Sequence, residues 1–123
     1  MNSDDTMAVG HGDNPDLHAM HRDLIALVRR LEGAIDSAPD AAAIVAITEQ
    51  MAEVNARVTS TGRVLLARQT VEIARHAKAF SDAFPEIERE IDALRDCERI
   101  VAGVAALLGT ADEAVRIATL TCR

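Results

Sequence analysis

The residues best suited to chemistry in this chain are two histidines, His18 and His21, in a segment with helical periodicity. Their three-residue spacing places both imidazoles one turn apart on a helix, where they could share a metal ion. Four further candidate ligands lie nearby in the sequence: His11, Asp13, Asp16 and Asp23. Carboxylate-bridged metal sites in helical bundles use Glu-x-x-His motifs, and this chain contains none. We therefore expect polar side chains at a helix start, no bound cofactor, and His18 and His21 as ligands should a metal bind.

Phosphotransfer through His21 or His76 is a second chemical hypothesis, because each histidine has a cation close by in the sequence. A phosphorylated histidine must be exposed on a helix face, where Arg22 or Lys78 could steady the phosphoryl group. Histidine-phosphotransfer proteins have a lysine three residues after the histidine, whereas Lys78 follows His76 by two. Phosphotransfer is therefore an alternative that this spacing does not favour.

Basic residues gather between positions 57 and 78, where the chain has five of them and a single acid, Glu72. The following stretch, residues 86–99, holds six acids and three bases. Ion pairing between adjacent helices explains this pattern, although such pairs stabilise little when exposed. A docking stripe for an acidic partner or nucleic acid is the other explanation. The partner-binding residues predicted for it are Arg57, Arg68, Arg75 and Lys78.

Catalysis is not expected, because the chain has no phosphate-binding glycine loop and no nucleophile elbow. The chain is 49% apolar, but only Phe80 and Phe84 are aromatic, so an aliphatic core leaves little room for a concave active site. A net charge of −7 disfavours nucleic acid, which needs a basic footprint.

A membrane location is also not expected. The longest apolar run, Ile100–Leu108, is far shorter than the about 20 residues that cross a bilayer. The N-terminal residues lack the basic character of a secretory signal. Cys97 and Cys122 are isolated, which favours reduced thiols over a disulfide. We predict a cytoplasmic protein with no membrane partner.

Apolar periodicity divides nearly the whole chain after an acidic, flexible tail (residues 1–13) into four helical segments of similar length. They are Pro15–Asp36, Asp40–Thr59, Arg63–Ala83 and Pro85–Leu108. Asn14 is the predicted N-cap of the first segment. Phe84 precedes a proline and should end the third segment, and Gly109 should end the fourth. A capping box then predicts a short last helix, Ala111–Leu120.

The middle of the chain admits two arrangements. Thr59–Gly62 has low helix propensity and predicts a break, yet the apolar seam continues in phase to Leu65, which favours one helix over Pro39–Ala83. A break gives a four-helix bundle closed within one chain, whereas an unbroken helix leaves apolar surface that dimerisation would cover. The predicted fold class is therefore an all-α antiparallel helical bundle, with residues 14–123 as one domain.

The predicted core consists of apolar residues at helical spacing. They are Leu24, Leu31, Ile44, Ile47, Met51, Val54, Leu65, Ile73, Phe80, Ile87, Ile91, Leu94, Val101 and Leu108. The predicted function is that of a non-catalytic interaction or adaptor protein, which acts through contacts with itself, as a homodimer, and with another protein. A small-molecule- or metal-binding bundle and a phosphotransfer bundle are the alternatives.

Overall fold

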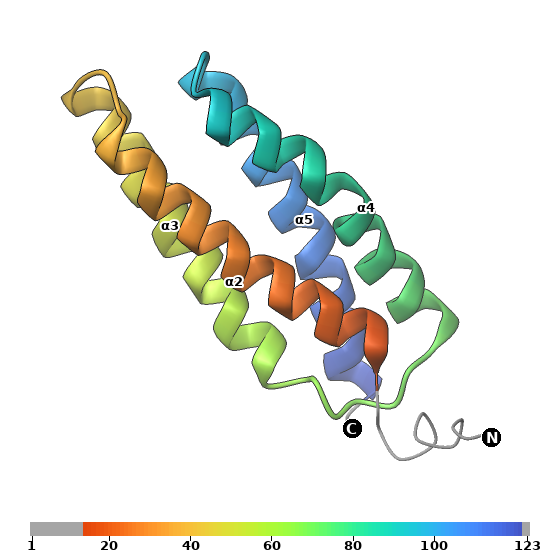
Figure 1. Ribbon diagram of the computed structural model, residues 1–123. Coiled ribbons are helices and arrows are strands. Elements are labelled where there is room, and N and C mark those ends of the chain that lie inside the picture. The colour runs from red at the N-terminus through yellow and green to blue at the C-terminus, as the bar shows by residue number, and fades with distance from the viewer. Residues whose placement is uncertain (1–13, 122–123) are drawn as a thin grey trace.

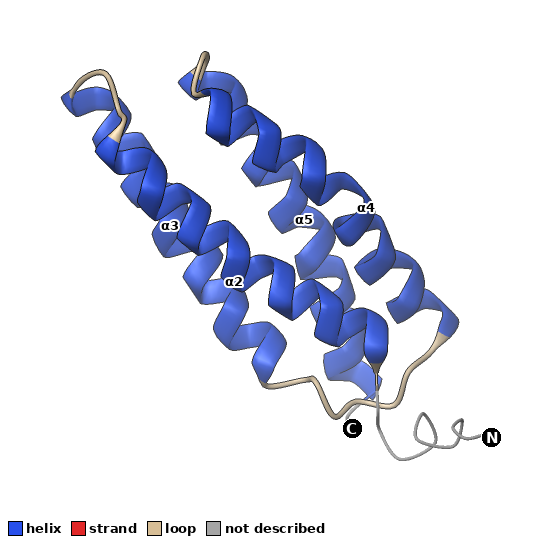
Figure 2. Cartoon of the chain, in the orientation of Figure 1, coloured by secondary structure: helices blue, strands red, loops and turns tan. Residues whose placement is uncertain are grey.

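Residues 14–121, which we describe from a computed structural model, form four helices. The predicted tail at residues 1–13 and Cys122 lie outside the described residues. The helices are α2 (Pro15–Asp36), α3 (Ala41–Gly62), α4 (Val71–Ala93) and α5 (Cys97–Thr121). Residues 14–121 contain no strand, as Figure 2 shows. The all-α helical bundle is confirmed. None of these helices combines the length and apolar character that crossing a membrane requires.

The helices form two hairpins that pack side by side. The main contacts are α2 with α3, α4 with α5, α2 with α4, and α3 with α5, so each helix has two principal neighbours. In Figure 1, α2 and α4 lie nearer the viewer, and the turns of both hairpins lie at one end of the bundle. The connection from α3 to α4 lies at the other end. The bundle thus has an α2/α4 face and an α3/α5 face.

The first helix begins and ends at the predicted residues, Pro15 and Asp36. Asn14 occupies the N-cap position, but its side chain makes no capping hydrogen bond. Instead its buried amide nitrogen Nδ2 donates to the carbonyl oxygen of Ala67 at 3.4 Å. Asn14 therefore ties the start of α2 to the connection between α3 and α4.

The chain breaks in its middle, but not at Thr59–Gly62, which is helical and forms the end of α3. Residues 63–70 make the connection, so the alternative of one helix over Pro39–Ala83 is wrong. Val64 and Ala67 are buried within the connection. The apolar residues that continued the seam thus cover the end of the bundle. Thr70 then starts α4, because its hydroxyl oxygen accepts from the backbone of Ile73.

Pro85 does not begin a helix, because it lies inside α4, which continues to Ala93. Proline in a helix interior loses one hydrogen bond and crowds the preceding turn. Burial outweighs that cost here: Phe84 and Ile91 flank the exposed Pro85 and are both buried. The predicted helix end at Phe84-Pro85 was therefore wrong. The turn instead falls at Leu94, which has a left-handed φ of 45°.

Gly109 does not end a helix either, and the predicted short helix Ala111–Leu120 is the last part of α5. The Thr110 hydroxyl donates to the carbonyl oxygen of Ala106 within the helix, so it does not cap a new one. One buried face runs through this region: Val104, Leu107, Leu108, Ala111, Ala114 and Ala118. Continuous burial against the other helices is why the helix passes through glycine.

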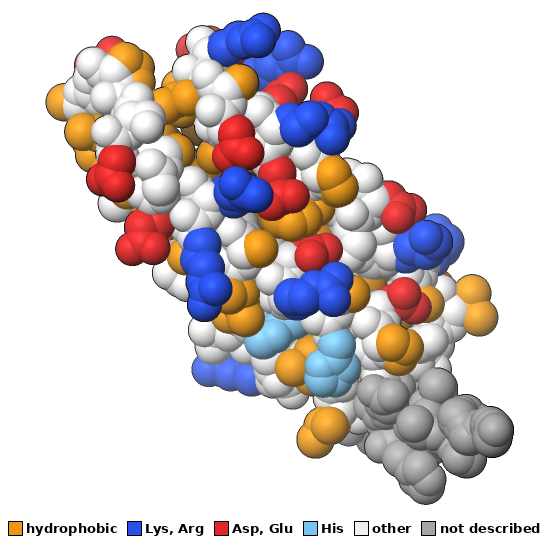
Figure 3. Space-filling model, in the orientation of Figure 1, with side chains coloured by type: hydrophobic (Ala, Val, Ile, Leu, Met, Phe, Trp, Pro, Cys, Tyr) orange, Lys and Arg blue, Asp and Glu red, His pale blue; other side chains and the backbone are white. Residues whose placement is uncertain are grey.

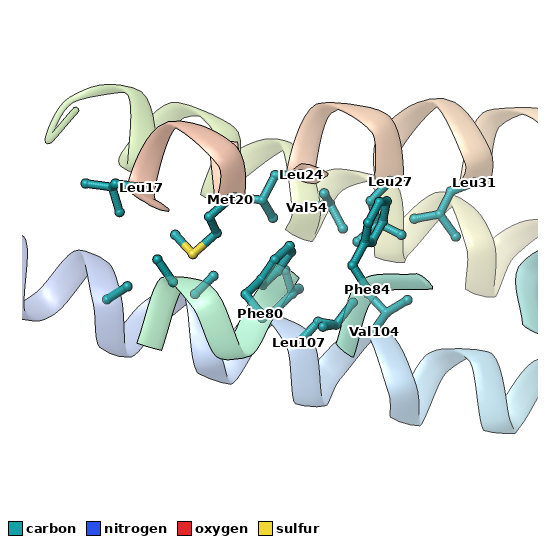
Figure 4. Close-up of a cluster of buried hydrophobic side chains, with 14 of the residues drawn as sticks. Leu17, Met20, Leu24, Leu27, Leu31, Val54, Phe80, Phe84, Val104 and Leu107 are labelled. Carbon is teal, nitrogen blue, oxygen red and sulfur yellow. The ribbon is translucent and has the colours of Figure 1, made fainter. Parts of the chain in front are cut away.

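The core lies between the four helices, as Figure 4 shows, with the rings of Phe80 and Phe84 stacked at 6.3 Å between centroids. Eight predicted core residues are buried: Leu24, Leu31, Ile47, Val54, Ile73, Phe80, Ile91 and Leu108. Five others are half-buried at its margin: Met51, Leu65, Ile87, Leu94 and Val101. Ile44 is 41% exposed, so its assignment to the core was wrong. It lies near the start of α3, in the first two turns.

Candidate functional site

The histidine pair of α2 lies on the α2/α4 face, where Figure 3 shows histidines among arginines and acids. His18 is exposed and His21 is half-buried. Both line an open depression of about 690 Å³, together with Arg22, Arg29 and Arg30. Its charged residues are mainly cations, which do not bind metal ions. Residues 14–121 hold no group of three His, Cys, Asp or Glu side chains that could bind a metal. His11 and Asp13 lie outside the described residues.

His76, the second phosphotransfer candidate, is half-buried on α4. It lies close enough to Glu113 of α5 to act on that carboxyl electrostatically. The pKa of Glu113 is lowered, first by the hydrogen bond from Arg116 and to a lesser extent by the charges of Arg116 and His76. The neighbour of this imidazole on α5 is therefore a carboxylate, which would repel a phosphoryl group.

A single basic stripe over residues 57–78 requires a continuous helix, and the connection at residues 63–70 interrupts the helix. Arg57 lies on α3, Arg68 in the connection, and Arg75 and Lys78 on the exposed surface of α4. Lys78 lies 3.5 Å from Asp82, one turn further along α4. The structure thus separates Arg57 from the other three residues, and they do not form a single stripe.

Arg57 makes an ion pair between α3 and α5. Its Nε and Nη2 donate to the two carboxylate oxygens of Asp112, both at 3.0 Å, and its Nη1 donates to Glu53. The hydrogen bond to Asp112 is the main cause that raises the pKa of Arg57, followed by the pairing with Glu53. Two parallel hydrogen bonds of this kind fix the relative position of the two helices. Arg57 therefore clamps α3 to α5.

The acids of residues 86–99 were expected to pair with the basic stretch before them, but two of them face α2. Arg30 donates to Glu88 at 3.0 Å and to Asp92 at 3.3 Å, which connects α2 with α4. A third acid, Glu90, pairs with Arg99 of α5 at 3.0 Å. The prediction that ion pairs join adjacent helices is confirmed, but these three acids pair with arginines of α2 and α5 and not with the basic residues at positions 57–78.

An apolar groove lies between α3 and α5, at the end of the bundle that holds the two hairpin turns. The groove is shallow and open to solvent, with a volume of about 650 Å³. Its lining comes from the first turns of both helices and the residues before α3: Pro39, Asp40, Ala42, Ala43, Ala46, Cys97, Glu98, Val101, Ala102 and Ala105. Alanine side chains on both walls do not reach across the seam, so the groove stays open. The Arg57–Asp112 ion pair bridges the same two helices further along.

Charge is distributed unequally between the two faces of the bundle. The helices α2 and α4 carry seven and nine charged side chains, whereas α3 and α5 carry three and five. Exposed apolar side chains also occur on α3, where Val45 is 57% exposed. An apolar groove with walls of small side chains is typical of a place where another molecule binds. The groove is therefore the candidate functional site.

None of the residues that the sequence singled out for chemistry or binding lines this groove. The available signals were the alanine-rich start of α3 and the charge-free stretch from Ile100 to Ala111. Neither signal is specific, because alanine is the best helix former and apolar residues also fill helix cores. Comparisons of the chain with protein-family models, with curated proteins and with solved structures found no match.

Proposed function

We propose that this protein is a non-catalytic interaction module: a four-helix bundle that binds another protein in the groove between α3 and α5. The observation that carries the proposal is the groove itself, with its alanine walls and its volume of about 650 Å³. Helix-binding proteins present an apolar groove of this kind to one face of a partner helix. Alanine walls also allow the backbone of a partner helix to approach closely.

The chemistry of the groove favours binding over catalysis. Three of its lining side chains can ionise: Asp40, Glu98 and Cys97. The Asp40 carboxylate already accepts a hydrogen bond from the backbone of Ala43 at 2.9 Å and caps α3. An active site needs several polar groups that converge on a reacting atom. Glu98 and Cys97 alone do not supply an acid, a base and an orienting group.

The predicted homodimer rested on an unbroken central helix, and that reason no longer applies because each helix packs against two others. Dimerisation therefore remains a prediction. The alternative of a ligand-binding bundle would use the same site, since a small apolar molecule would also bind in this groove. The experiment below distinguishes a second copy from another protein by the mass of the product.

The test is photo-crosslinking in cells that produce the protein. Benzoylphenylalanine replaces Ala102 on the groove wall, or, as a matched control, Ala79, which is exposed on α4. We expect a defined adduct from position 102 and none from position 79. Addition of Ala46→Glu, which places a charge in the groove, should abolish the adduct at position 102. Mass spectrometry of that adduct then identifies either a second copy or a different protein.

Two results would contradict the proposal. One is the absence of an adduct at position 102, and the other is the same set of adducts at positions 102 and 79. Circular dichroism of each variant provides the folding control, because Ala79 and Ala102 are both exposed and their replacement should leave the helical content unchanged.

A further inference from the structure

The dimensions of the groove match a short helical ridge. Its wall on α5 runs from Cys97 to Ala105, and its wall on α3 ends at Ala46. The eight steps from Cys97 to Ala105 span about 12 Å at 1.5 Å per residue, which is a little over two turns. A partner helix that lies along such a groove inserts the side chains of one face, at positions i, i+3 or i+4, and i+7. The groove therefore accommodates about three apolar side chains.

The rim of the groove carries acidic side chains that form no ion pair within residues 14–121. Asp40 and Glu98 line the groove, and Glu49 follows Ala46 by three positions on α3. Among residues 14–121, Glu49 and Glu98 take part in no ion pair of 4.0 Å or less, and Asp40 accepts only its capping hydrogen bond.

The arginines of the same two helices are already engaged with other acids. Arg57 pairs with Asp112, Arg99 with Glu90, and Arg116 with Glu113. None of these three arginines therefore pairs with Asp40 or Glu98. A partner with cations beside its apolar residues would gain electrostatic attraction here.

The same charges disfavour two other occupants. A second copy placed face to face by a two-fold axis would bring Asp40 and Glu98 toward their own counterparts, and like charges that meet across an interface repel. The N-terminal segment of this chain carries Asp4, Asp5 and Asp13 and no Lys or Arg, so its charge has the wrong sign. The net charge of the whole chain is −7.

We infer that the groove binds a cationic amphipathic helix of a partner protein, with an apolar ridge against the alanine walls and Lys or Arg beside Asp40 and Glu98. This inference rests on the proposed function and specifies its partner. The apolar ridge supplies contact area in the groove. The flanking cations supply selectivity and faster association, both of which decrease as salt increases.

The test uses two synthetic 18-residue helical peptides with the same leucine ridge, one flanked by lysines and the other by glutamates. Fluorescence anisotropy measures binding to the full chain, and amide NMR maps the contact. We expect only the lysine peptide to bind and to shift the amides of Ala42, Ala46 and Ala105. Glu98→Gln and Asp40→Asn should each raise Kd about two- to fivefold, since asparagine preserves the cap. Glu32→Gln on α2 is the matched control and should leave Kd unchanged.

A groove-filling variant keeps the inference falsifiable if the charge effects are small. Ala46→Trp should abolish peptide binding, whereas Ala79→Trp on α4 should not. Persistent binding to Ala46→Trp, or amide shifts confined to the α2/α4 face, would overturn the inference. Equal binding of the glutamate peptide in the groove would overturn the cationic partner but leave the interaction module standing. Sedimentation velocity tests for a second copy in the groove. If the protein is a dimer and Ala46→Trp dissociates it, the occupant is a second copy, which overturns the cationic partner but leaves the interaction module standing.

Discussion

Replacing Gly103 with alanine tests the closest approach between α4 and α5. A Cβ atom at this position would lie 2.6 Å from Cδ1 of Ile87 and 3.8 Å from its Cγ1. The first distance is far below van der Waals contact, while the second is an ordinary contact. Gly109 lies on the same helix, and a Cβ there meets nothing within 4 Å. The two glycines thus form a matched pair on one helix: an added methyl group clashes with a neighbour at Gly103 and has free space at Gly109.

The expected free energies follow from these contacts. Alanine in place of glycine in a helix interior gains about 0.8–1.0 kcal/mol, which Gly109→Ala should realise in full. At Gly103, the terminal methyl of Ile87 must move, which costs about 0.5–1.5 kcal/mol in an unfavourable rotamer. Loss of its burial costs up to about 0.8 kcal/mol more. Gly103→Ala should therefore be less stable than Gly109→Ala by about 1–2 kcal/mol.

Thermal and urea unfolding followed by circular dichroism measure this difference, which corresponds to roughly 3–6 °C in Tm per kcal/mol for a chain of this length. Ile87→Val removes Cδ1, so Gly103→Ala should become stabilising in that background by about 0.8–1.0 kcal/mol. The double-mutant cycle then yields a coupling of about 1–2 kcal/mol. If Gly103→Ala stabilises the protein as much as Gly109→Ala and the coupling is near zero, α4 and α5 do not pack as described here.

Three further substitutions test other parts of the structure. Leu94 has a left-handed φ of 45°, which glycine adopts more readily than alanine. Leu94→Gly should therefore be more stable than Leu94→Ala by about 1 kcal/mol in thermal unfolding, whereas in a regular helix alanine is the more stable of the two. Arg57→Ala should cost about 0.3–1 kcal/mol in urea unfolding at low salt and less at 1 M salt, because its partner Asp112 is half exposed. The lowered pKa of Glu113 means that the stability it contributes is present above the ordinary value of 4.5 and is lost as pH falls through the folded value. An NMR titration should show its midpoint below 4.5, and Arg116→Ala should move that midpoint upward.

Sequence periodicity predicted four long helical segments and the bounds of α2, but it added a separate short helix, Ala111–Leu120, and placed three breaks wrongly. The reason is common to all three. Gly109 and Pro85 weaken an isolated helix, yet the apolar residues around them are buried against neighbouring helices, and burial contributes more than propensity costs. Thr59–Gly62 behaves likewise, since Thr61 is fully buried. Residues of low helix propensity do not show by themselves whether the surrounding segment will be buried against other helices.

The true helix boundaries had weaker signals in the sequence. Thr70 caps α4 through a single hydroxyl, and a threonine in a run of mixed residues does not identify itself as a cap. Leu94 ends α4 in a left-handed conformation that favours glycine or asparagine, so its residue type predicts the opposite. The start of α2 was predicted because Asn14 and Pro15 both indicate it. Boundaries were therefore predictable where several signals agreed.

The candidate site could not be predicted because it depends on which helices become neighbours. Arg57 was assigned to a partner-binding stripe together with Arg75, but it clamps α3 to α5 through Asp112, 55 residues further along the chain. The alanines of the groove are ordinary helix formers in sequence. They become a groove only because α3 and α5 pack next to each other with small side chains on both sides of the seam.

The clamp and the groove follow from one feature of the α3/α5 seam, which is how far the side chains on each helix reach. Where Arg57 and Asp112 extend across the seam, two hydrogen bonds of 3.0 Å close it. Where Ala46 and Ala105 face it, the side chains end after one carbon atom and an apolar space remains. The residues that give these helices their high propensity thus also leave the surface unfilled. Two larger side chains in these positions, such as leucines at 46 and 105, would fill that space, stabilise the bundle and remove its proposed function.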